Sequence, residues 1–494
     1  MSSPVEISFT SLICIDKSSS TPIYIQLAQQ FVNAIQRGYL SIGARMPGTR
    51  ILSKDLKVHR KTIIAAFEEL EAQGWLEIVP NKGTFILQKD IKQLQSRHIT
   101  SLQTIKTYPE KTGFEFTQSN ILDSPFELNP CSYYFTDGTP DIRITQLQAL
   151  SQHYGSALKR KSNLRKMANY QEHGSLYFKE QLSNYLNLTR GLHIAAYNLL
   201  VSRSSEMSLY LIARVVLSPG DCVVVGNLSN FSINMTFAQV GAKIATIAMD
   251  EEGICVHSLT NLVQQKKVRM LYLTPHHHYP TTVTLSAQRR IEILKLAKEY
   301  GFFILEDDYD YDFHYENTAI LPLASADSHG LVIYTGTFGK SLIPTFRTSF
   351  VVAPKNLIQE MNKYLGIIDR HGDIVTEYAL GQMIEEGDIH RHLKKSILAY
   401  KNRRDETAVT LKKLFNDTIQ FTIPKGGLAF WVRFKENIQF LKVAKYAQEQ
   451  DLFIPRNIFY QNQEITAMRL GFGNWEPLEM KNNLEILKES MLKI

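Results

Sequence analysis

The stretch that decides the fold of most of this chain is Leu331-Val332-Ile333-Tyr334-Thr335-Gly336-Thr337-Phe338-Gly339-Lys340. Its apolar start, followed by glycines, predicts a buried strand that ends shortly before Lys340. A second apolar run, Phe302-Phe303-Ile304-Leu305, leads in the same way into Glu306-Asp307-Asp308-Tyr309-Asp310. Ligands of α/β proteins bind beyond the carboxyl ends of the strands. The two runs therefore predict a site that contains a lysine and a carboxylate.

This pair of side chains is the one that a pyridoxal phosphate (PLP) enzyme requires. Lys340 would form the Schiff base with the cofactor, and the carboxylate of Asp307 would pair with the pyridinium nitrogen. A lysine at a strand end is otherwise usually a surface residue, and an aspartate there usually caps a helix. The interpretation therefore depends on the rest of the chain.

Composition sets broad limits. With 494 residues, 44% of them hydrophobic, the chain is long enough for more than one domain. Its four cysteines form no Cys-x-x-Cys pair, which argues against a disulfide framework or a zinc site and favours a reducing cytoplasm. We expect neither a membrane span nor a signal peptide. The net charge of +7 is a weak indication of a polyanionic partner.

The first part of the chain has the pattern of three helices and a hairpin. Thr21-Pro22 starts a helix whose apolar residues recur every three or four positions until Gly38 ends it. A second helix is expected over about 50–56, with Thr49 as its cap, and a third over about 59–73, stopped by Gly74. Lys57-Val58 would form the tight turn between them. Residues 75–79 and 84–87 predict two strands around a glycine-containing turn.

This order of elements is a winged helix-turn-helix, which predicts DNA binding. The basic residues between positions 45 and 62, opposed by Asp55 alone, are Arg45, Arg50, Lys54, Lys57, Arg60 and Lys61. A charge run by itself usually marks a solvated face. Here it falls at the start of the third helix, where side chains reach bases and phosphates in the major groove.

The segments 46–50, 58–62 and 70–75 resemble the GntR family of bacterial regulators. That resemblance implies DNA contacts from Arg50, His59, Arg60, Lys61, Thr62, Lys82 and Gly83. His59 stands where the family usually has Ser or Thr, so we expect a weaker helix cap there. The domain boundaries we expect are 15–89 for the DNA-binding domain, 90–115 for a polar linker, and 116–494 for the large domain.

The large domain alternates apolar runs with helical stretches. Strands are expected at 221–225, 270–273, 302–305 and 331–334, with helices such as 207–217 and 287–300 between them. This alternation predicts an α/β fold with a mostly parallel sheet and helices on both faces. Residues after about 385 predict a smaller α+β subdomain.

Six landmarks in order resemble the fold-type-I, aspartate-aminotransferase-like PLP proteins. They are Gly138-Thr139-Pro140-Asp141, Thr274-Pro275-His276-His277-His278-Tyr279-Pro280-Thr281, residues 306–310, residues 336–340, Pro344-Thr345-Phe346-Arg347 and Arg469-Leu470-Gly471-Phe472. With the winged helix in front, the whole chain resembles the MocR subgroup of GntR regulators.

The resemblance implies a role for each landmark residue. Lys340 would hold PLP covalently, Asp307 the ring nitrogen and Tyr309 the phenolic oxygen, while Phe231 would stack on the ring. The phosphate would be held by Ser204, Ser205, Thr337 and Arg347, and by Tyr170 acting on the partner subunit's cofactor. Arg469 would bind an effector carboxylate bidentately.

Several positions depart from the family pattern. Ser204 replaces a glycine and Glu206 adds negative charge beside the phosphate turn. Phe231 lacks the hydroxyl of the usual tyrosine. Further replacements are His278, Thr282, Gly339 and Ser349. The run of three histidines at 276–278 invites a metal interpretation, but adjacent histidines in a loop rarely converge on one ion, and we predict no metal site.

These patterns lead to one hypothesis and two alternatives. We expect a cytoplasmic transcription regulator, a head-to-tail homodimer, that binds a duplex operator and senses a small amine, an amino acid or PLP. We do not expect a true enzyme, beyond vestigial aminotransferase activity. The first alternative is a working PLP-dependent aminotransferase with a DNA-binding appendage. The second is a regulator whose large domain has lost PLP and serves as a scaffold.

Overall fold

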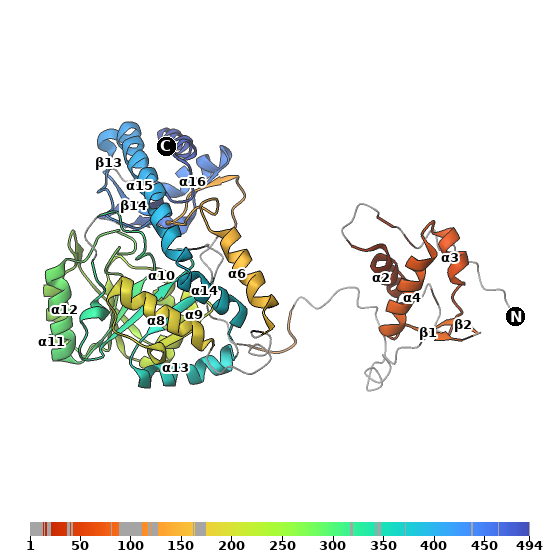
Figure 1. Cartoon of the computed structure of the whole chain (residues 1–494). Coiled ribbons are helices and arrows are strands. Elements are labelled where there is room, and N and C mark those ends of the chain that lie inside the picture. Colours follow the sequence, from red (N-terminus) through yellow and green to blue (C-terminus); the bar gives the residue numbers. More distant parts are fainter. Residues whose placement is uncertain are drawn as a thin grey trace. The chain divides into compact units, whose positions relative to one another are not determined.

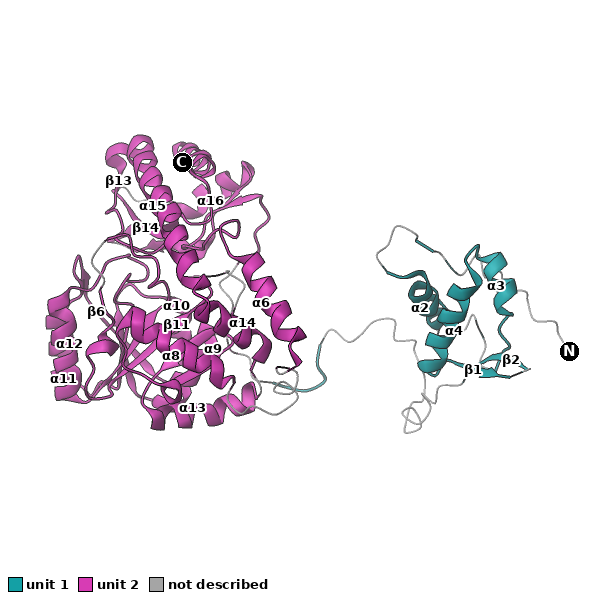
Figure 2. Cartoon of the chain, viewed as in Figure 1, with its two compact units in different colours: residues 1–116 teal, residues 117–494 magenta. Residues whose placement is uncertain are grey.

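The computed structural model describes residues 13, 15–16, 21–36, 40, 43–80, 82–87, 111–116, 119, 127–161, 163, 174–316, 320–340, 342, 347–370, 372–435, 438–462 and 464–493. The chain divides into two compact units, residues 1–116 and 117–494 (Figures 1 and 2). Gly38, Tyr170 and almost all of the expected linker lie outside the described residues.

The smaller unit is a winged helix-turn-helix (Figure 1). It consists of α2 (Ile23–Gln36), α3 (Thr49–Asp55), α4 (Arg60–Ala72), β1 (Leu76–Val79) and β2 (Gly83–Ile86). The strands pair antiparallel, with Val79 opposite Gly83. The expected apolar stripe is buried, and Phe31 of α2 meets Phe67 of α4 edge to face at 6.2 Å between ring centroids.

The turns and helix ends of this unit depend on the backbone conformation and side-chain hydrogen bonds of nearby residues. Lys57 adopts a φ of 51° in the turn between α3 and α4, and Gly74 adopts 75° after α4. The expected cap of α3 is wrong by one residue. Gly48 is the N-cap, without a side-chain bond, and Thr49 is the first helical residue. The Thr49 hydroxyl instead accepts a 3.2 Å hydrogen bond from Nε of Arg60, so it serves the following helix.

The larger unit is built on a seven-stranded sheet in the order β4-β12-β11-β10-β9-β5-β6. The strands are β4 (Leu199–Ser202), β5 (Cys222–Gly226), β6 (Lys243–Ile247), β9 (Met270–Leu273), β10 (Phe303–Asp308), β11 (Val332–Thr337) and β12 (Ser349–Val352). Only β12 runs antiparallel to its neighbours among these strands. The predicted mostly parallel sheet is confirmed, and β10 and β11 lie side by side.

Helices cover both faces of the sheet, because its strands are apolar on both sides. Val223 and Val225 of β5 face one apolar cluster and Val224 faces the other. The helices of this part are α8 (Leu176–Arg190), α9 (Ser205–Val216), α10 (Phe231–Gln239), α11 (Val256–Gln265), α12 (Ala287–Tyr300) and α13 (Lys355–Ile368). Short elements between them are η2 (Ala196–Asn198), β7 (Met249–Asp250), β8 (Gly253–Ile254) and η3 (Leu323–Ala326).

The carboxyl-terminal part is the predicted α+β subdomain. Its antiparallel sheet has the order β13-β14-β17-β16, from β13 (Ile419–Gln420), β14 (Ala429–Phe434), β16 (Phe459–Gln461) and β17 (Thr466–Gly471). The surrounding elements are α14 (Ile374–Glu385), α15 (Asp388–Phe415), η4 (Asn416–Thr418), α16 (Phe440–Glu449), η5 (Arg456–Ile458) and α17 (Pro477–Leu492). α6 (Leu147–Lys159) packs against α14, and β15 (Leu452–Phe453) pairs with β3 (Tyr133–Tyr134). No helix in the described ranges is both long and apolar enough to cross a membrane.

Candidate functional site

Lys340 lies three residues beyond the end of β11 and is half-buried. Its Nζ is 4.6 Å from the centroid of the Tyr309 ring. Desolvation lowers the pKa of this amine, and the negative charges of Asp310 and Asp137 oppose that shift. An amine with a lowered pKa is unprotonated for a larger fraction of the time, which is the form that attacks a carbonyl carbon.

Asp307 is a buried carboxylate near the end of β10. Its Oδ2 accepts a 2.8 Å hydrogen bond from the hydroxyl of Tyr272 on the neighbouring β9. Burial raises the pKa of Asp307 to about 7, and the Tyr272 hydrogen bond and the charge of Lys340 oppose this rise. A buried acid of this kind is stabilised by a proton or by a cationic partner.

Tyr309 and Arg469 are joined to each other. The Tyr309 hydroxyl donates to the carbonyl of His277 at 2.8 Å and accepts from Arg469 at 3.2 Å. Arg469 is fully buried and also donates to the carbonyls of Asp137 and Pro280, each at 2.8 Å. Three of the five guanidinium N–H groups are thus used within the protein. An effector carboxylate could take the remaining two, or displace one of these acceptors.

The expected phosphate turn forms the start of α9. Ser204 is its N-cap, and its hydroxyl accepts a 3.1 Å bond from the backbone N–H of Met207. Ser205 and Glu206 occupy the first turn, where helix N–H groups lack partners in the helix ladder and attract anions. The Glu206 side chain is exposed beside this turn.

Three buried serines connect the phosphate turn to β11. Ser202 donates to the carbonyl of Ser204 at 2.9 Å and lies 2.8 Å from the hydroxyl of Ser208. Ser208 donates to Ser349 at 3.1 Å, and Ser349 donates to the carbonyl of Gly336 at 2.8 Å. The replacement of the family's glycine by Ser349 therefore completes a chain of hydroxyl groups.

The other expected phosphate and ring residues are Thr337, which lies opposite Ser349 in the sheet, Arg347, Phe231 and Tyr170. The Thr337 hydroxyl donates to the carbonyl of Thr348 at 3.2 Å and accepts from the N–H of Gly339 at 3.1 Å. Arg347 is exposed. Phe231 begins α10 and lines an open pocket of about 690 Å³. Tyr170 is not among the described residues.

The three histidines after β9 have three different partners. His276 Nδ1 lies 3.1 Å from Asp308 Oδ1, His277 Nδ1 lies 2.9 Å from Asp310 Oδ1, and His278 Nδ1 lies 2.8 Å from the Thr281 hydroxyl. Burial, with the nearby charge of Arg469, lowers the pKa of His278 to about 3. The imidazoles therefore do not face one common point.

Thr282 occupies the position of a family glycine and has the matching backbone. Its φ is 62°, in the left-handed region, where a β-branched side chain costs roughly 1–2 kcal/mol. The turn is closed by the bond from its N–H to the carbonyl of His278 at 2.7 Å. The local fold is thus kept although the glycine is not.

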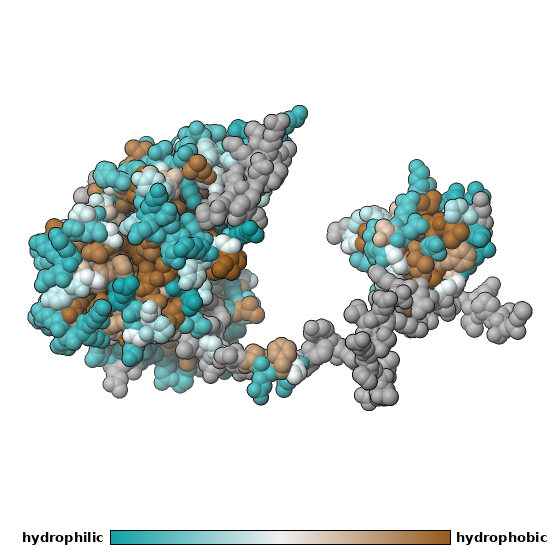
Figure 3. Space-filling model, turned by 90° about the horizontal axis from the view of Figure 1, so that it is seen from below, coloured by the Kyte–Doolittle hydropathy of each residue, from teal (hydrophilic) through white to brown (hydrophobic). Residues whose placement is uncertain are grey.

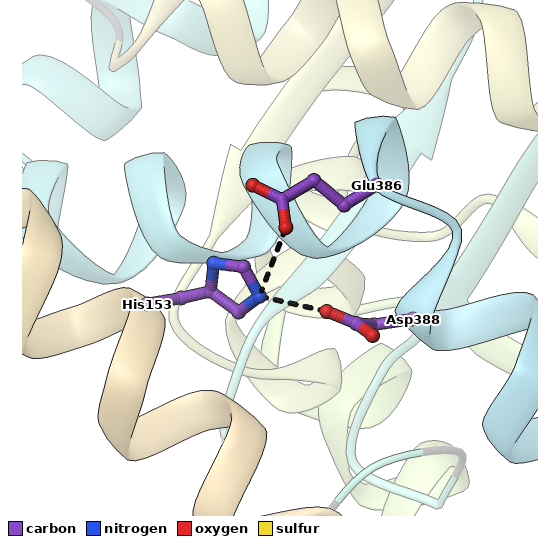
Figure 4. Close-up of side chains that lie close together, drawn as sticks. All are labelled: His153, Glu386 and Asp388. Atoms are coloured by element: carbon purple, nitrogen blue, oxygen red, sulfur yellow. Dashed lines mark hydrogen bonds and ion pairs between the residues drawn. The ribbon is translucent and has the colours of Figure 1, made fainter.

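A group of metal-ligand type lies elsewhere, between α6 and the turn from α14 to α15 (Figure 4). His153 Nε2 is 2.7 Å from Asp388 Oδ2 and 4.0 Å from Glu386 Oε2. The second oxygen of Asp388 accepts a 2.6 Å bond from Arg391. A cation is therefore already supplied to this carboxylate by the protein, and the group serves to fasten α6 to the turn.

On the smaller unit, the expected DNA contacts are mostly exposed. His59 is the N-cap of α4, and its Nδ1 accepts a 3.2 Å bond from the N–H of Lys61, so the imidazole does cap the helix. The exposed side chains of the predicted set are Arg50, His59, Arg60, Lys61 and Lys82. Thr62 and Gly83 are half-buried.

Sequence reasoning missed several residues of these sites. Arg45 was counted as basic but not assigned to the wing, where its backbone pairs with that of Phe85 and its guanidinium lies against Gly83. Tyr272 looked like an ordinary apolar strand residue. All four residues of its strand are buried, so no feature of the sequence separates Tyr272 from its core neighbours.

Comparison with known proteins agrees with both units. Residues 23–86 match the family model for bacterial regulatory proteins, gntR family. The chain is 24% identical to the uncharacterized HTH-type transcriptional regulator YdeL of Bacillus subtilis, over 96% of this chain and 98% of that protein. It is 22% identical to the probable rhizopine catabolism regulatory protein MocR of Rhizobium meliloti, over 98% and 96%. The multiple substrate aminotransferase of Thermococcus profundus superposes with a TM-score of 0.68 at 24% identity, covering 76% of this chain and 93% of that one.

These findings define a class of protein in which a GntR-type helix-turn-helix is followed by an aminotransferase-like fold. The chain has this arrangement of domains, and the relatives that it matches along its full length are MocR and other HTH-type transcriptional regulators.

Proposed function

We propose that this regulator binds a duplex operator through α4 and the wing, while its larger unit binds PLP and senses a small amine, an amino acid or PLP itself. The observation that supports this most is the position of Lys340 and Asp307. A desolvated amine just past the end of β11 and a buried carboxylate near the end of the neighbouring β10 occur in the same chain as a GntR-type DNA-binding domain.

The residues fit PLP by their chemistry. Asp307 is a buried acid whose ionised form needs a cation, and a protonated ring nitrogen would supply one. Lys340 would be the residue that bonds to the cofactor, and Phe231 the residue that stacks on its ring. The phosphate would be held by Ser204, Ser205, Thr337 and Arg347, with Tyr170 acting across a dimer. When bound, PLP supplies an aldehyde that reacts reversibly with amines and a ring that withdraws electrons.

The side chains around the proposed cofactor site would set the protonation of Lys340 and Asp307 and keep water away from them. Desolvation lowers the pKa of Lys340, which increases the fraction of neutral amine at Nζ that can react and exchange with an incoming amine. Tyr272 orients Asp307 through its 2.8 Å hydrogen bond. The Tyr309 hydroxyl is hydrogen-bonded to both His277 and Arg469, which fixes the position of its ring next to Nζ of Lys340. Arg469 would bind an effector carboxylate through its remaining N–H groups.

The residues of the phosphate turn at the start of α9 favour a regulator over an enzyme with rapid turnover. The Cβ of Ser204 occupies the place of a glycine, and Glu206 adds a negative charge in the first turn of α9. Both changes oppose the tight, close phosphate binding that a fast enzyme needs. A working aminotransferase remains the alternative, and it predicts steady turnover with an amino donor and an oxo acid.

A homodimer is part of the proposal, because two winged helices would match two operator half-sites. Exposed apolar side chains support it. On α6 they are Leu147, Tyr154 and Leu158, and at the start of α8 Leu176 is 62% exposed. Apolar side chains also gather among hydrophilic ones on the face of the larger unit drawn in Figure 3. Effector exchange would alter the half-site spacing that the dimer tolerates, with a coupling free energy of about 1–3 kcal/mol.

The test uses the full-length chain and operator DNA found by footprinting upstream of its own gene. We expect PLP to give a visible absorption band that borohydride reduction bleaches while leaving the cofactor covalently attached, and we expect Lys340→Ala to abolish this covalent attachment. Titration of PLP and of amines should then change operator affinity. A protein that gives no reducible band would be a scaffold, and one with unchanged operator affinity would not be a sensor.

A further inference from the structure

The pocket beside Phe231 lies between the two halves of the larger unit. One wall comes from the segment before and at the start of α10, with Leu228, Ser229 and Phe231. The other wall comes from η5, β16 and the turn that follows, with Tyr460 at its centre. Its volume of about 690 Å³ is in the range of small-molecule sites.

A row of rings connects this pocket to Lys340. The Tyr460 side chain lies near that of Tyr279, and its hydroxyl is buried without a hydrogen-bond partner among the described residues. The Tyr279 ring lies 6.1 Å from that of Tyr309, and the Tyr309 ring lies 4.6 Å from Nζ of Lys340. The guanidinium of Arg469 lies 4.6 Å from the Tyr279 ring. The pocket is therefore next to the proposed cofactor site.

Among the described residues that line the pocket, the charges cancel. Its charged lining residues are Glu127 and Arg456, whose Oε1 and Nε are 2.8 Å apart. The backbone N–H of Arg456 also donates to the second oxygen of Glu127 at 3.1 Å. Both oxygens of Glu127 are thus engaged by Arg456, and the pair carries no net charge with which to attract a charged ligand group.

The polar groups of the lining are largely engaged with the protein. The Gln461 amide donates to the carbonyl of Ile438 at 2.9 Å, and the Asn462 side-chain oxygen accepts from two backbone N–H groups at 2.8 Å. The Ser229 hydroxyl accepts from Asn234 at 2.8 Å. What the walls offer a ligand is chiefly aromatic and aliphatic surface, supplied by Leu228, Phe231, Phe459, Tyr460 and Ile465.

We propose that this pocket receives the side arm of the effector and selects amines and amino acids whose side arm is uncharged and largely apolar. The inference rests on the proposed function, because it assumes that the effector's amine is presented to Lys340. Burial of a charged side arm against these walls would remove it from water beside an ion pair that has no net charge to offset the loss, and that cost disfavours it.

The experiment compares three amino acids of similar length: norleucine, glutamate and lysine. Full-length protein loaded with PLP is titrated with each, and the half-saturating concentration is read from the shift of the cofactor band. A second reading is the intrinsic fluorescence of the Lys340→Ala protein without PLP, since the Trp431 ring lies 5.1 Å from that of Tyr460. We expect norleucine to half-saturate at a concentration about tenfold or more below the other two.

Two variants make the charge argument specific. Glu127→Gln leaves Arg456 unpaired and should improve glutamate relative to norleucine, whereas Arg456→Gln leaves Glu127 unpaired and should improve lysine. The matched control is the double variant Glu127→Gln with Arg456→Gln. Its pocket again has no net charge at these two positions, so it should restore the wild-type order of half-saturating concentrations for norleucine, glutamate and lysine.

Equal half-saturation by norleucine, glutamate and lysine would overturn the inference while leaving the proposed function intact. Variants that fail to change the order would also overturn it. If no PLP band forms and no fluorescence change occurs with any of the three, the proposed function and this inference fall together.

Discussion

The hydroxyl of Tyr272 donates a 2.8 Å hydrogen bond to Oδ2 of Asp307 from the adjacent strand, and both side chains are buried. A hydrogen bond to the ionised form of an acid favours that form, and this bond counteracts the desolvation that raises the pKa of Asp307 to about 7. The tyrosine would therefore act on the proposed cofactor through the aspartate.

The first prediction concerns Tyr272→Phe. Without the donor, the pKa of Asp307 rises further, so less of the carboxylate is ionised at neutral pH and PLP should bind about tenfold more weakly. The measurement is the dissociation constant of PLP from its absorption band. Tyr334→Phe is the matched control, because Tyr334 is buried on the next strand and donates at 2.7 Å to Asp308 instead. Equal losses in both variants would contradict the role given to Tyr272.

The second prediction is a pH dependence of the cofactor-free protein. A buried acid with a raised pKa binds its proton more tightly in the folded state, so this group's contribution to stability falls as pH rises from about 4 to about 7. Asp307→Asn removes the titrating group, so the loss of stability that Asp307 causes as pH rises should disappear. Its melting temperature should exceed that of the wild type at pH 8 and equal it near pH 4.5. The difference between the two proteins isolates Asp307, because other buried acids titrate in both. A constant difference at the two pH values would count against a protonated Asp307.

The serine chain gives the third prediction. Ser349→Ala removes a donor to the carbonyl of Gly336 and an acceptor for Ser208, all in a buried place, and should destabilise the protein by about 1–3 kcal/mol. Ser208→Ala combined with Ser349→Ala should cost less than the sum of the two single changes, because they share one interaction. Thermal unfolding of the three variants measures this. Additive losses would show that the chain does not act as a unit.

The residues just discussed indicate what a sequence can and cannot predict here. The strands at 302–305 and 331–334 were predictable because apolar runs ending in glycine or acidic residues are local properties. The placing of Lys340 beyond β11 followed from them. The partner of Asp307 was not predictable, since Tyr272 has no local feature that separates it from a core residue. Its role arises only when β9 and β10 lie side by side.

Helix ends illustrate the same limit. His59 was expected to cap α4 weakly, and its imidazole does accept the bond from Lys61, because that geometry depends on neighbouring residues alone. Thr49 was assigned to the cap of α3, yet its hydroxyl bonds to Arg60, eleven residues further along the chain. The burial of Arg469 under Tyr279 likewise depends on contacts between distant segments.

The last prediction separates base reading from phosphate binding in the winged helix. The Nε of Arg60, at the start of α4, donates to the Thr49 hydroxyl, and the Arg60 side chain is exposed. Arg60→Ala should weaken binding to the operator by about 1–3 kcal/mol if Arg60 reads a base, with little change on random duplex.

Arg45, beside the wing at Gly83, is the matched cation. Arg45→Ala should weaken binding to operator and random duplex alike, and should reduce the slope of log affinity against log salt by about one. Fluorescence anisotropy with both duplexes at several salt concentrations distinguishes the two residues. If Arg60→Ala loses equally on random duplex, Arg60 is a phosphate contact and sequence must be read by other residues of α4. Thr49→Val then decides whether the orientation of Arg60 matters, because it removes the acceptor without changing the charge.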